Sequence, residues 1–180
     1  MKYIITGAQG TGKSTILHCF EDKMDVVTEV VRNLSKDKNI KVNERGDEEG
    51  QDMIFNTYKE IFNNKKGPFI SDRGLTDVMS YTCYLMRTGK VSEEFLQKQV
   101  NEFIDFQDNN KDIVYFYTPI EFDVVDDGFR SLNEDFRKEI DKNIKDFLVG
   151  FNVDYIEVKG TVEERVETIE NVMRSYGDIE

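Results

Sequence analysis

Short apolar runs, rich in β-branched and aromatic side chains, recur along the chain with the length of buried strands. They cover residues 3–5, 26–28, 68–72, 112–118 and 153–158. The run at 112–118 is the longest and has the composition of a central strand, and Pro119 closes it. After each run the periodicity changes, so we interpret the five runs as separate strands.

Between these runs, apolar residues recur every three or four positions, as in a helix with one buried face. The predicted helices cover about residues 13–23, 47–63, 76–87 and 92–107, with two more beginning near 131 and 161. Strands that alternate with helices in this way specify an α/β fold. We expect a three-layer sandwich in which a five-stranded parallel sheet has helices on both faces.

Some details of this pattern are specific enough to test. Ser131 with Glu134 and Thr161 with Glu164 match the capping box that opens a helix. The helical period turns Ile104 inward in the helix at 92–107, and Val162 inward in the last helix. The segment from residue 33 to 50 is polar, and we interpret its charged end as a solvated run that opens the helix at 47.

The first strand leads into the sequence Gly7-Ala-Gln-Gly-Thr-Gly12-Lys13-Ser14, which matches the phosphate-binding pattern G-x-x-x-x-G-K-[ST]. Such glycines let successive backbone N–H groups point inward, and the following helix adds its positive N-terminal end. Lys13 is expected to reach the β- and γ-phosphates and Ser14 to hold Mg²⁺. The residues predicted to bind a nucleoside triphosphate are Gly7, Ala8, Gln9, Gly10, Thr11, Gly12, Lys13, Ser14 and Thr15.

Other polar residues directly follow the predicted strands. They are Glu29, Asp72, Thr118 and Lys159. Ligands of parallel sheets bind beyond the carboxyl ends of the strands, so we expect these residues to gather beside the phosphate loop. Asp72 has the position where many phosphate-loop proteins place the carboxylate that is the metal's second contact, and the guanidinium of Arg73 can clamp phosphoryl oxygens.

The segment Asp72-Arg-Gly-Leu-Thr-Asp-Val-Met-Ser-Tyr81 resembles the Asp-Arg segment of thymidylate kinases and the Glu-Arg-Ser segment of deoxynucleoside kinases. Together with the phosphate loop, Glu29-Val-Val-Arg32 and Asp126-Asp-Gly-Phe-Arg130, it makes the chain similar to P-loop kinase-like domains related to nicotinamide-riboside kinases. The resemblance runs from residue 1 to about 173 and implies a P-loop NTPase fold. Gly74 and Asp77 replace the aromatic residue and serine that thymidylate kinases prefer, which argues against thymidylate as the acceptor.

The resemblance also implies roles for individual residues. Glu29 matches by position the glutamate that takes the proton of the acceptor hydroxyl in deoxynucleoside kinases; its alternative is a first-turn carboxylate that complements a helix dipole. Residues 119–137 resemble the mobile lid of small-molecule kinases, which excludes water from the reaction. The implied catalytic residues are Lys13, Glu29, Asp72, Arg73 and Arg130. The implied substrate-binding residues are Glu29, Arg32, Arg73, Asp77, Arg130 and Arg137.

Composition narrows the remaining possibilities. The 180 residues suit one domain with a lid, and the net charge of −12 disfavours a protein that grips nucleic acid by its phosphates. No apolar run approaches the roughly 20 residues that cross a bilayer. Cys19 and Cys83 are expected as reduced core residues of a cytoplasmic protein, and His18 as a structural residue.

The sequence therefore predicts an ATP- and Mg²⁺-dependent kinase that acts on a small nucleoside or nucleotide. Three alternatives stay open: a kinase acting on hydroxymethylated pyrimidine bases in DNA, as some phage kinases of this broad class do; a nucleotide-dependent ATPase or GTPase switch; and a monophosphate kinase that uses its arginines on the acceptor phosphate. The pattern does not distinguish ATP from GTP, and it leaves the acceptor and the oligomeric state open.

Overall fold

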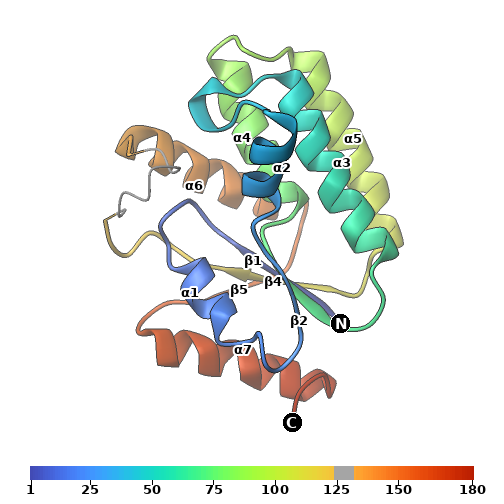
Figure 1. Cartoon of the computed structure of the whole chain (residues 1–180), viewed down its shortest axis with the longest axis vertical. Helices are drawn as coiled ribbons and strands as arrows, with labels where there is room; N and C mark the ends of the chain where they lie inside the picture. The colour runs from blue at the N-terminus through green and yellow to red at the C-terminus, as the bar shows by residue number, and fades with distance from the viewer. Residues whose placement is uncertain (124–131) are drawn as a thin grey trace.

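The computed structural model describes residues 1–123 and 132–180, and this part of the chain contains one five-stranded parallel sheet. Its strands are β1 (Lys2–Thr6), β2 (Asp25–Val27), β3 (Phe69–Asp72), β4 (Ile113–Tyr117) and β5 (Tyr155–Glu157). Their order is β2-β3-β1-β4-β5, so β1 lies at the centre between β3 and β4. The predicted α/β fold with a five-stranded parallel sheet is confirmed (Figure 1).

Helices connect the strands. They are α1 (Lys13–His18), α2 (Val30–Lys38), α3 (Glu48–Asn64), α4 (Leu75–Arg87), α5 (Glu93–Asn109), α6 (Glu134–Gly150) and α7 (Val162–Tyr176), with a short 3-10 turn at Asn43–Arg45. Side chains cap four of them as local chemistry requires: Asp47, Ser92, Asn133 and Thr161 each accept backbone N–H bonds at a helix N-terminus. The capping box of Thr161 with Glu164 is confirmed.

Two helix boundaries were predicted wrongly, and one helix was not predicted. Helix α1 ends at His18 rather than near residue 23, because tight turns follow; Phe20 and Met24 nevertheless pack beneath the sheet. Helix α2 was not predicted, because its apolar side chains are confined to its first half and none is fully buried. Asn133, rather than Ser131, caps α6; Ser131 lies outside the described residues.

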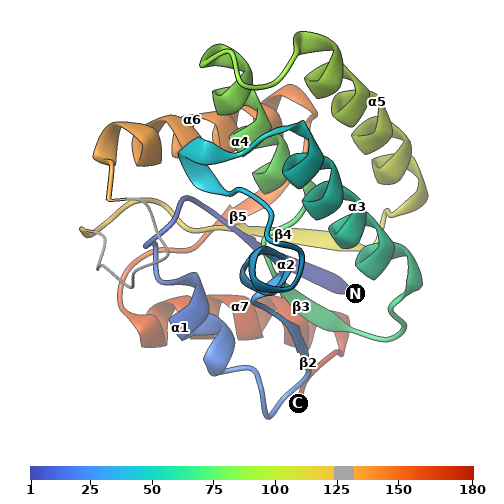
Figure 2. The same ribbon diagram turned by 45° about the horizontal axis from the view of Figure 1, so that its top comes forward.

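The two faces of the sheet carry separate apolar cores, and the alternation of β1 shows how they form. Ile4 points into the core made with α3, α4, α5 and α6, whereas Tyr3 and Ile5 point into the core made with α1 and α7. Figures 1 and 2 show α6 and α7 on opposite sides of the sheet. The expected three-layer arrangement is therefore present.

Several residues predicted for the core lie at the surface. Ile104 is 45% exposed, and Val162, the first residue of α7, is 38% exposed. Both cysteines are free, as expected, but only Cys83 is buried, while Cys19 is exposed just after α1 ends. His18 is exposed and lies beside Glu21, and it does not line the cavity next to the phosphate loop.

No helix within residues 1–123 and 132–180 has the length and hydrophobicity to span a bilayer. The lid predicted over 119–137 falls partly on residues 124–131, which lie outside the described part of the chain. That prediction stays a prediction.

Candidate active site

The phosphate loop connects β1 to α1, and its glycines adopt backbone conformations that other residues rarely tolerate. The φ angles of Gly7, Gly10 and Gly12 are 151°, 69° and 86°. Gly7 also lies against the end of β4: a Cβ atom there would come within 2.4 Å of Thr118 Oγ1 and 2.5 Å of the Thr118 carbonyl oxygen. Glycine at position 7 is therefore required both by the backbone and by the space.

We expect Gly7→Ala to destabilise the fold by about 1–3 kcal/mol, the range for forcing extra atoms into a packed site. Because the loop must move away from Thr118, triphosphate binding should be lost as well. Gly89→Ala is the matched control, since Gly89 has a φ of 73° but no atom within 4 Å of its added Cβ. Thermal unfolding and titration with ATP measure both effects, and equal behaviour of the two variants would contradict this account.

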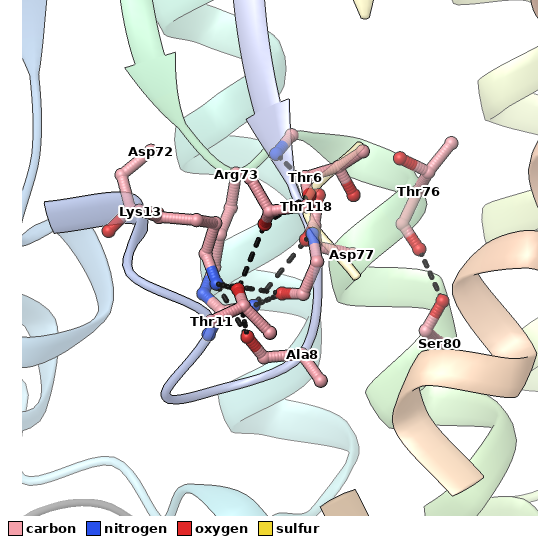
Figure 3. A network of polar contacts seen from close by, with 12 residues as sticks. Thr6, Ala8, Thr11, Lys13, Asp72, Arg73, Thr76, Asp77, Ser80 and Thr118 are labelled. Carbon is pink, nitrogen blue, oxygen red and sulfur yellow. Dashed lines mark hydrogen bonds and ion pairs between the residues drawn. The ribbon is translucent and has the colours of Figure 1, made fainter. Parts of the chain in front are cut away.

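Lys13 lies at the start of α1 and is buried within the loop. Its Nζ donates to the carbonyl oxygens of Gly7 at 2.8 Å and Ala8 at 2.6 Å, and to Thr11 Oγ1 at 3.3 Å. Thr11 in turn hydrogen-bonds with Thr118 at 2.9 Å between the two hydroxyl oxygens. Figure 3 shows this network, in which Lys13 and Arg73 approach the loop together. The ammonium group is thus held at the loop and lines the adjoining cavity.

The Asp-Arg segment after β3 is joined to the same loop. Arg73 has a left-handed φ of 75°, and its Nη1 donates to the Gly7 carbonyl at 3.1 Å. The guanidinium also lies over the Tyr81 ring, 5.5 Å from its centroid, and forms an ion pair with Asp77 at 3.4 Å. This geometry puts one cation beside the first residue of the phosphate loop.

Asp77 ties these parts together. Its carboxylate accepts from the backbone N–H of Gly74 at 3.0 Å and of Gly7 at 3.4 Å, and its side chain is only 1% exposed. Burial raises the pKa of this carboxyl above its ordinary value, although Arg73 and Lys13 act in the opposite direction. Asp77 lines the cavity as predicted, and its oxygens are bonded to the protein.

Asp72, in contrast, has an oxygen available. Its Oδ1 is buried and has no hydrogen-bond partner among the described residues. In Figure 3 its carboxylate points away from the cluster of Arg73 and Asp77. Asp72 and Ser14 both line the cavity, and carboxylate and hydroxyl oxygens are ligands that Mg²⁺ accepts. These residues fit a magnesium ion that takes its other ligands from phosphate and water.

A cavity of about 300 Å³ extends from the phosphate loop past Asp72 and Arg73. Its lining also includes apolar, aromatic and amide side chains, a set that the sequence did not single out. These side chains belong to Val42, Asn43, Gln51, Ile54, Tyr58 and Tyr81. A signal did exist in α3, where Gln51, Ile54 and Tyr58 follow helical spacing and a fully buried glutamine interrupts an apolar face.

Glu29 and Arg32 line the same cavity. Glu29 precedes α2 and has a left-handed φ of 59°, and its side chain makes no capping hydrogen bond to the helix. Instead its Oε2 pairs with Arg32 Nε at 3.1 Å. Both residues therefore lie where the sequence predicted, in one cleft with the phosphate loop.

Two other predicted residues are placed differently, and a third lies outside the described residues. Lys159 pairs with Glu157 at the surface and does not line the cavity, so only Glu29, Asp72 and Thr118 gather beside the loop. Arg137 is 1% exposed, and its guanidinium is bonded to loop carbonyls rather than directed into open space. Arg130 lies outside the described part of the chain, as does the stretch from Asp126.

The strand order, the glycine-rich loop after β1 and the Asp-Arg pair after β3 define a P-loop protein with the fold of nucleoside and nucleotide kinases. Residues 2–165 match the family described as AAA domain, and the chain belongs to that family. No curated protein matches the chain.

Solved structures with this fold include deoxyadenosine kinase from M. mycoides, with a TM-score of 0.68 and 20% identity over 98% of this chain and 100% of that chain. The NadR protein in complex with NAD and AMP-PNP has a TM-score of 0.73 and 12% identity, and it matches 98% of this chain but only 49% of its own. Thymidylate kinase from Candida albicans has a TM-score of 0.61 and 13% identity over 99% of this chain and 93% of that chain. These likenesses confirm the expected fold relationship.

Proposed function

We propose that the chain is an ATP- and Mg²⁺-dependent kinase that phosphorylates a hydroxyl group of a small nucleoside. The observation that carries the proposal is the single cavity that joins the phosphate loop, Asp72, Arg73 and Glu29 to a pocket of aromatic and amide side chains. The M. mycoides deoxyadenosine kinase binds dATP, and the NadR protein binds AMP-PNP, which supports a nucleotide ligand for the same fold.

The donor end is argued from the phosphate loop. Its N–H groups and the positive end of α1 favour the phosphates, while Lys13 and Arg73 bring two cations to the point where negative charge develops during transfer. Ser14 and Asp72 would hold Mg²⁺, which would neutralise part of the negative charge of the phosphates. The protein's own contribution is to orient the terminal phosphate toward the middle of the cavity.

The acceptor end favours a neutral molecule. Among the described residues, the two arginines that line the cavity both have carboxylate partners: Arg32 pairs with Glu29, and Arg73, which also lies beside the phosphate loop, pairs with Asp77. A phosphate on the acceptor would have to compete with these carboxylates, whereas a hydroxyl would be activated by one of them. Glu29 would accept the hydroxyl proton as the phosphoryl group arrives.

The aromatic and amide part of the lining suits a flat heterocycle. Tyr58 and Tyr81 supply aromatic surface, and Asn43 and Gln51 supply amide groups that can hydrogen-bond the edge of a base. Such walls of mixed character bind small ligands by stacking and by a few directed hydrogen bonds. A nucleoside satisfies both requirements.

The deciding experiment is a coupled ADP-release screen with ATP and GTP as donors. The acceptors are ribonucleosides, deoxynucleosides, their monophosphates and nicotinamide riboside, with DNA containing hydroxymethylated pyrimidines as a separate arm. We expect turnover with nucleosides above turnover with the matching monophosphates. Turnover with monophosphates alone would favour the alternative that the two arginines of the cavity suggest, and hydrolysis unchanged by any acceptor would contradict a kinase.

Asp72→Asn tests the magnesium assignment. Removing one negative charge from the metal's contact should reduce Mg²⁺-dependent triphosphate binding by about tenfold or more, the effect of losing a charge-assisted contact. Binding in EDTA should change little. Asp154→Asn, at an exposed carboxylate just before β5, is the control. Calorimetric titrations with and without Mg²⁺ measure the difference, and an equal loss under both conditions would show that Asp72 is structural.

A further inference from the structure

Two buried arginines hold the outer side of the phosphate loop. Arg137 in α6 is 1% exposed, and its Nε donates to the Gln9 carbonyl oxygen at 2.9 Å while its Nη2 donates to that of Gly10 at 3.1 Å. Nη2 also donates to the Phe122 carbonyl at 2.7 Å, and Nη1 pairs with Glu134. The planar guanidinium thus spans two consecutive carbonyls of the loop.

Arg165 in α7 reaches the next carbonyl. It is also 1% exposed, and its Nη1 donates to the Thr11 carbonyl oxygen at 2.7 Å. Its Nε donates to the Gly160 carbonyl at 2.9 Å, Nη2 pairs with Glu121, and the guanidinium lies 5.3 Å from the centroid of the Phe122 ring. Since α6 and α7 lie on opposite faces of the sheet, the loop is held from two sides (Figure 2).

Because the peptide bond is planar, these contacts to carbonyl oxygens also fix the direction of the neighbouring N–H groups. In a trans peptide, the C=O of one residue and the N–H of the next point in opposite directions. Fixing the carbonyls of Gln9, Gly10 and Thr11 on the outer side therefore directs the N–H groups of residues 10, 11 and 12 away from the arginines. Those are N–H groups of the phosphate nest.

The positive charge of the two arginines also favours anion binding at the loop. A buried guanidinium is costly unless its donors are bonded, and within residues 1–123 and 132–180 each arginine has one carboxylate partner, which is itself partly exposed. Helix anchoring alone would not require a cation at both places, because apolar side chains anchor helices without a desolvation cost. Two positive charges directly behind the loop instead raise the potential where an anion binds.

We propose that Arg137 and Arg165 are positioning residues that orient the peptide groups of the phosphate loop and add positive potential behind it, so that the polyphosphate of the nucleotide is bound. The inference rests on the proposed nucleotide site but not on phosphoryl transfer. It assigns Arg137 a role through the loop backbone rather than through direct contact with the acceptor.

The test measures binding of MgATP and of inorganic tripolyphosphate by calorimetry, without an acceptor. Arg137→Met and Arg165→Met should each lower the affinity for both ligands by about tenfold or more, because each variant loses hydrogen bonds from a charged group. Arg137→Lys, which keeps the charge but not the planar fork, should lie between wild type and Arg137→Met. Binding of the best nucleoside from the screen should stay within about twofold of wild type, because nucleosides carry no phosphate.

Leu148→Ala is the control for general destabilisation, since Leu148 is a fully buried core residue of α6. If the arginine variants bind both polyphosphates as tightly as this control, the proposal is overturned. Wild-type protein that binds neither ligand overturns it too. Should the methionine variants fail to fold, Arg137→Lys and Arg165→Lys decide by the same comparison. The arginine variants could show the expected loss of polyphosphate binding in a protein that has no transferase activity. That result would overturn the proposed function but leave this inference standing.

Discussion

Lys13→Met should lower phosphoryl transfer by at least about 10²–10³-fold, the loss seen when one preorganised charge-stabilising donor is removed. The structure gives two reasons for so large an effect. The Lys13 ammonium is held among the carbonyls of Gly7 and Ala8, within reach of the phosphates that the loop is built to bind. Methionine keeps the apolar stem, so the packing of α1 should survive while the charge disappears.

Single-turnover transfer with the best acceptor measures this effect, together with the melting temperature. Lys66→Met is the matched control, because Lys66 is exposed and precedes β3, at the opposite edge of the sheet. We expect the control to match wild type in both measurements. A transfer rate of Lys13→Met within about threefold of wild type would be a far smaller loss than removal of a charge-stabilising donor causes. That result would remove the phosphate loop from the mechanism.

The sequence predicted those parts of the molecule that local chemistry decides. Each strand is a short apolar run, and the phosphate loop needs only glycines, Lys13 and Ser14 in a fixed spacing, so both were found where the structure has them. The gathering of Glu29 and Asp72 beside the loop followed from the rule that parallel strands end at one edge. Topology, rather than propensity, carried that prediction.

The parts that were not predicted depend on contacts between distant segments. Arg137 was assigned to the lid because residues 119–137 resemble the lid of small-molecule kinases, yet in α6 its side chain bonds the carbonyl of Gln9, 128 residues earlier. Gln51 was hidden because its partner, Thr82, lies in another helix. Helix α2 was missed because half of its residues have no apolar partner to mark the period. No local pattern encodes such pairs.

Glu29→Gln is the variant that separates a hydroxyl acceptor from a phosphate acceptor. Glu29 has a left-handed backbone, which costs roughly 1–2 kcal/mol in a residue other than glycine. Strain of this kind persists where the surrounding structure enforces it, and it is concentrated at functional sites. Glu29 is the N-cap residue of α2, where a carboxylate can complement the helix dipole, but its side chain makes no capping hydrogen bond and pairs with Arg32 instead.

If Glu29 is the general base, the glutamine variant should lose about 10²–10⁴-fold in the transfer rate with a nucleoside, and MgATP affinity should stay near wild type. The volume and the left-handed backbone are kept, so stability should change little. The variant also releases Arg32 from its ion pair, which would favour an acceptor phosphate. A monophosphate kinase should therefore keep or gain activity in the same variant.

Single-turnover transfer with both acceptor types decides, with Glu49→Gln in the first turn of α3 as the control. A loss below about tenfold with the nucleoside would take Glu29 out of the mechanism and move the assignment to a phosphate acceptor bound by Arg32 and Arg73.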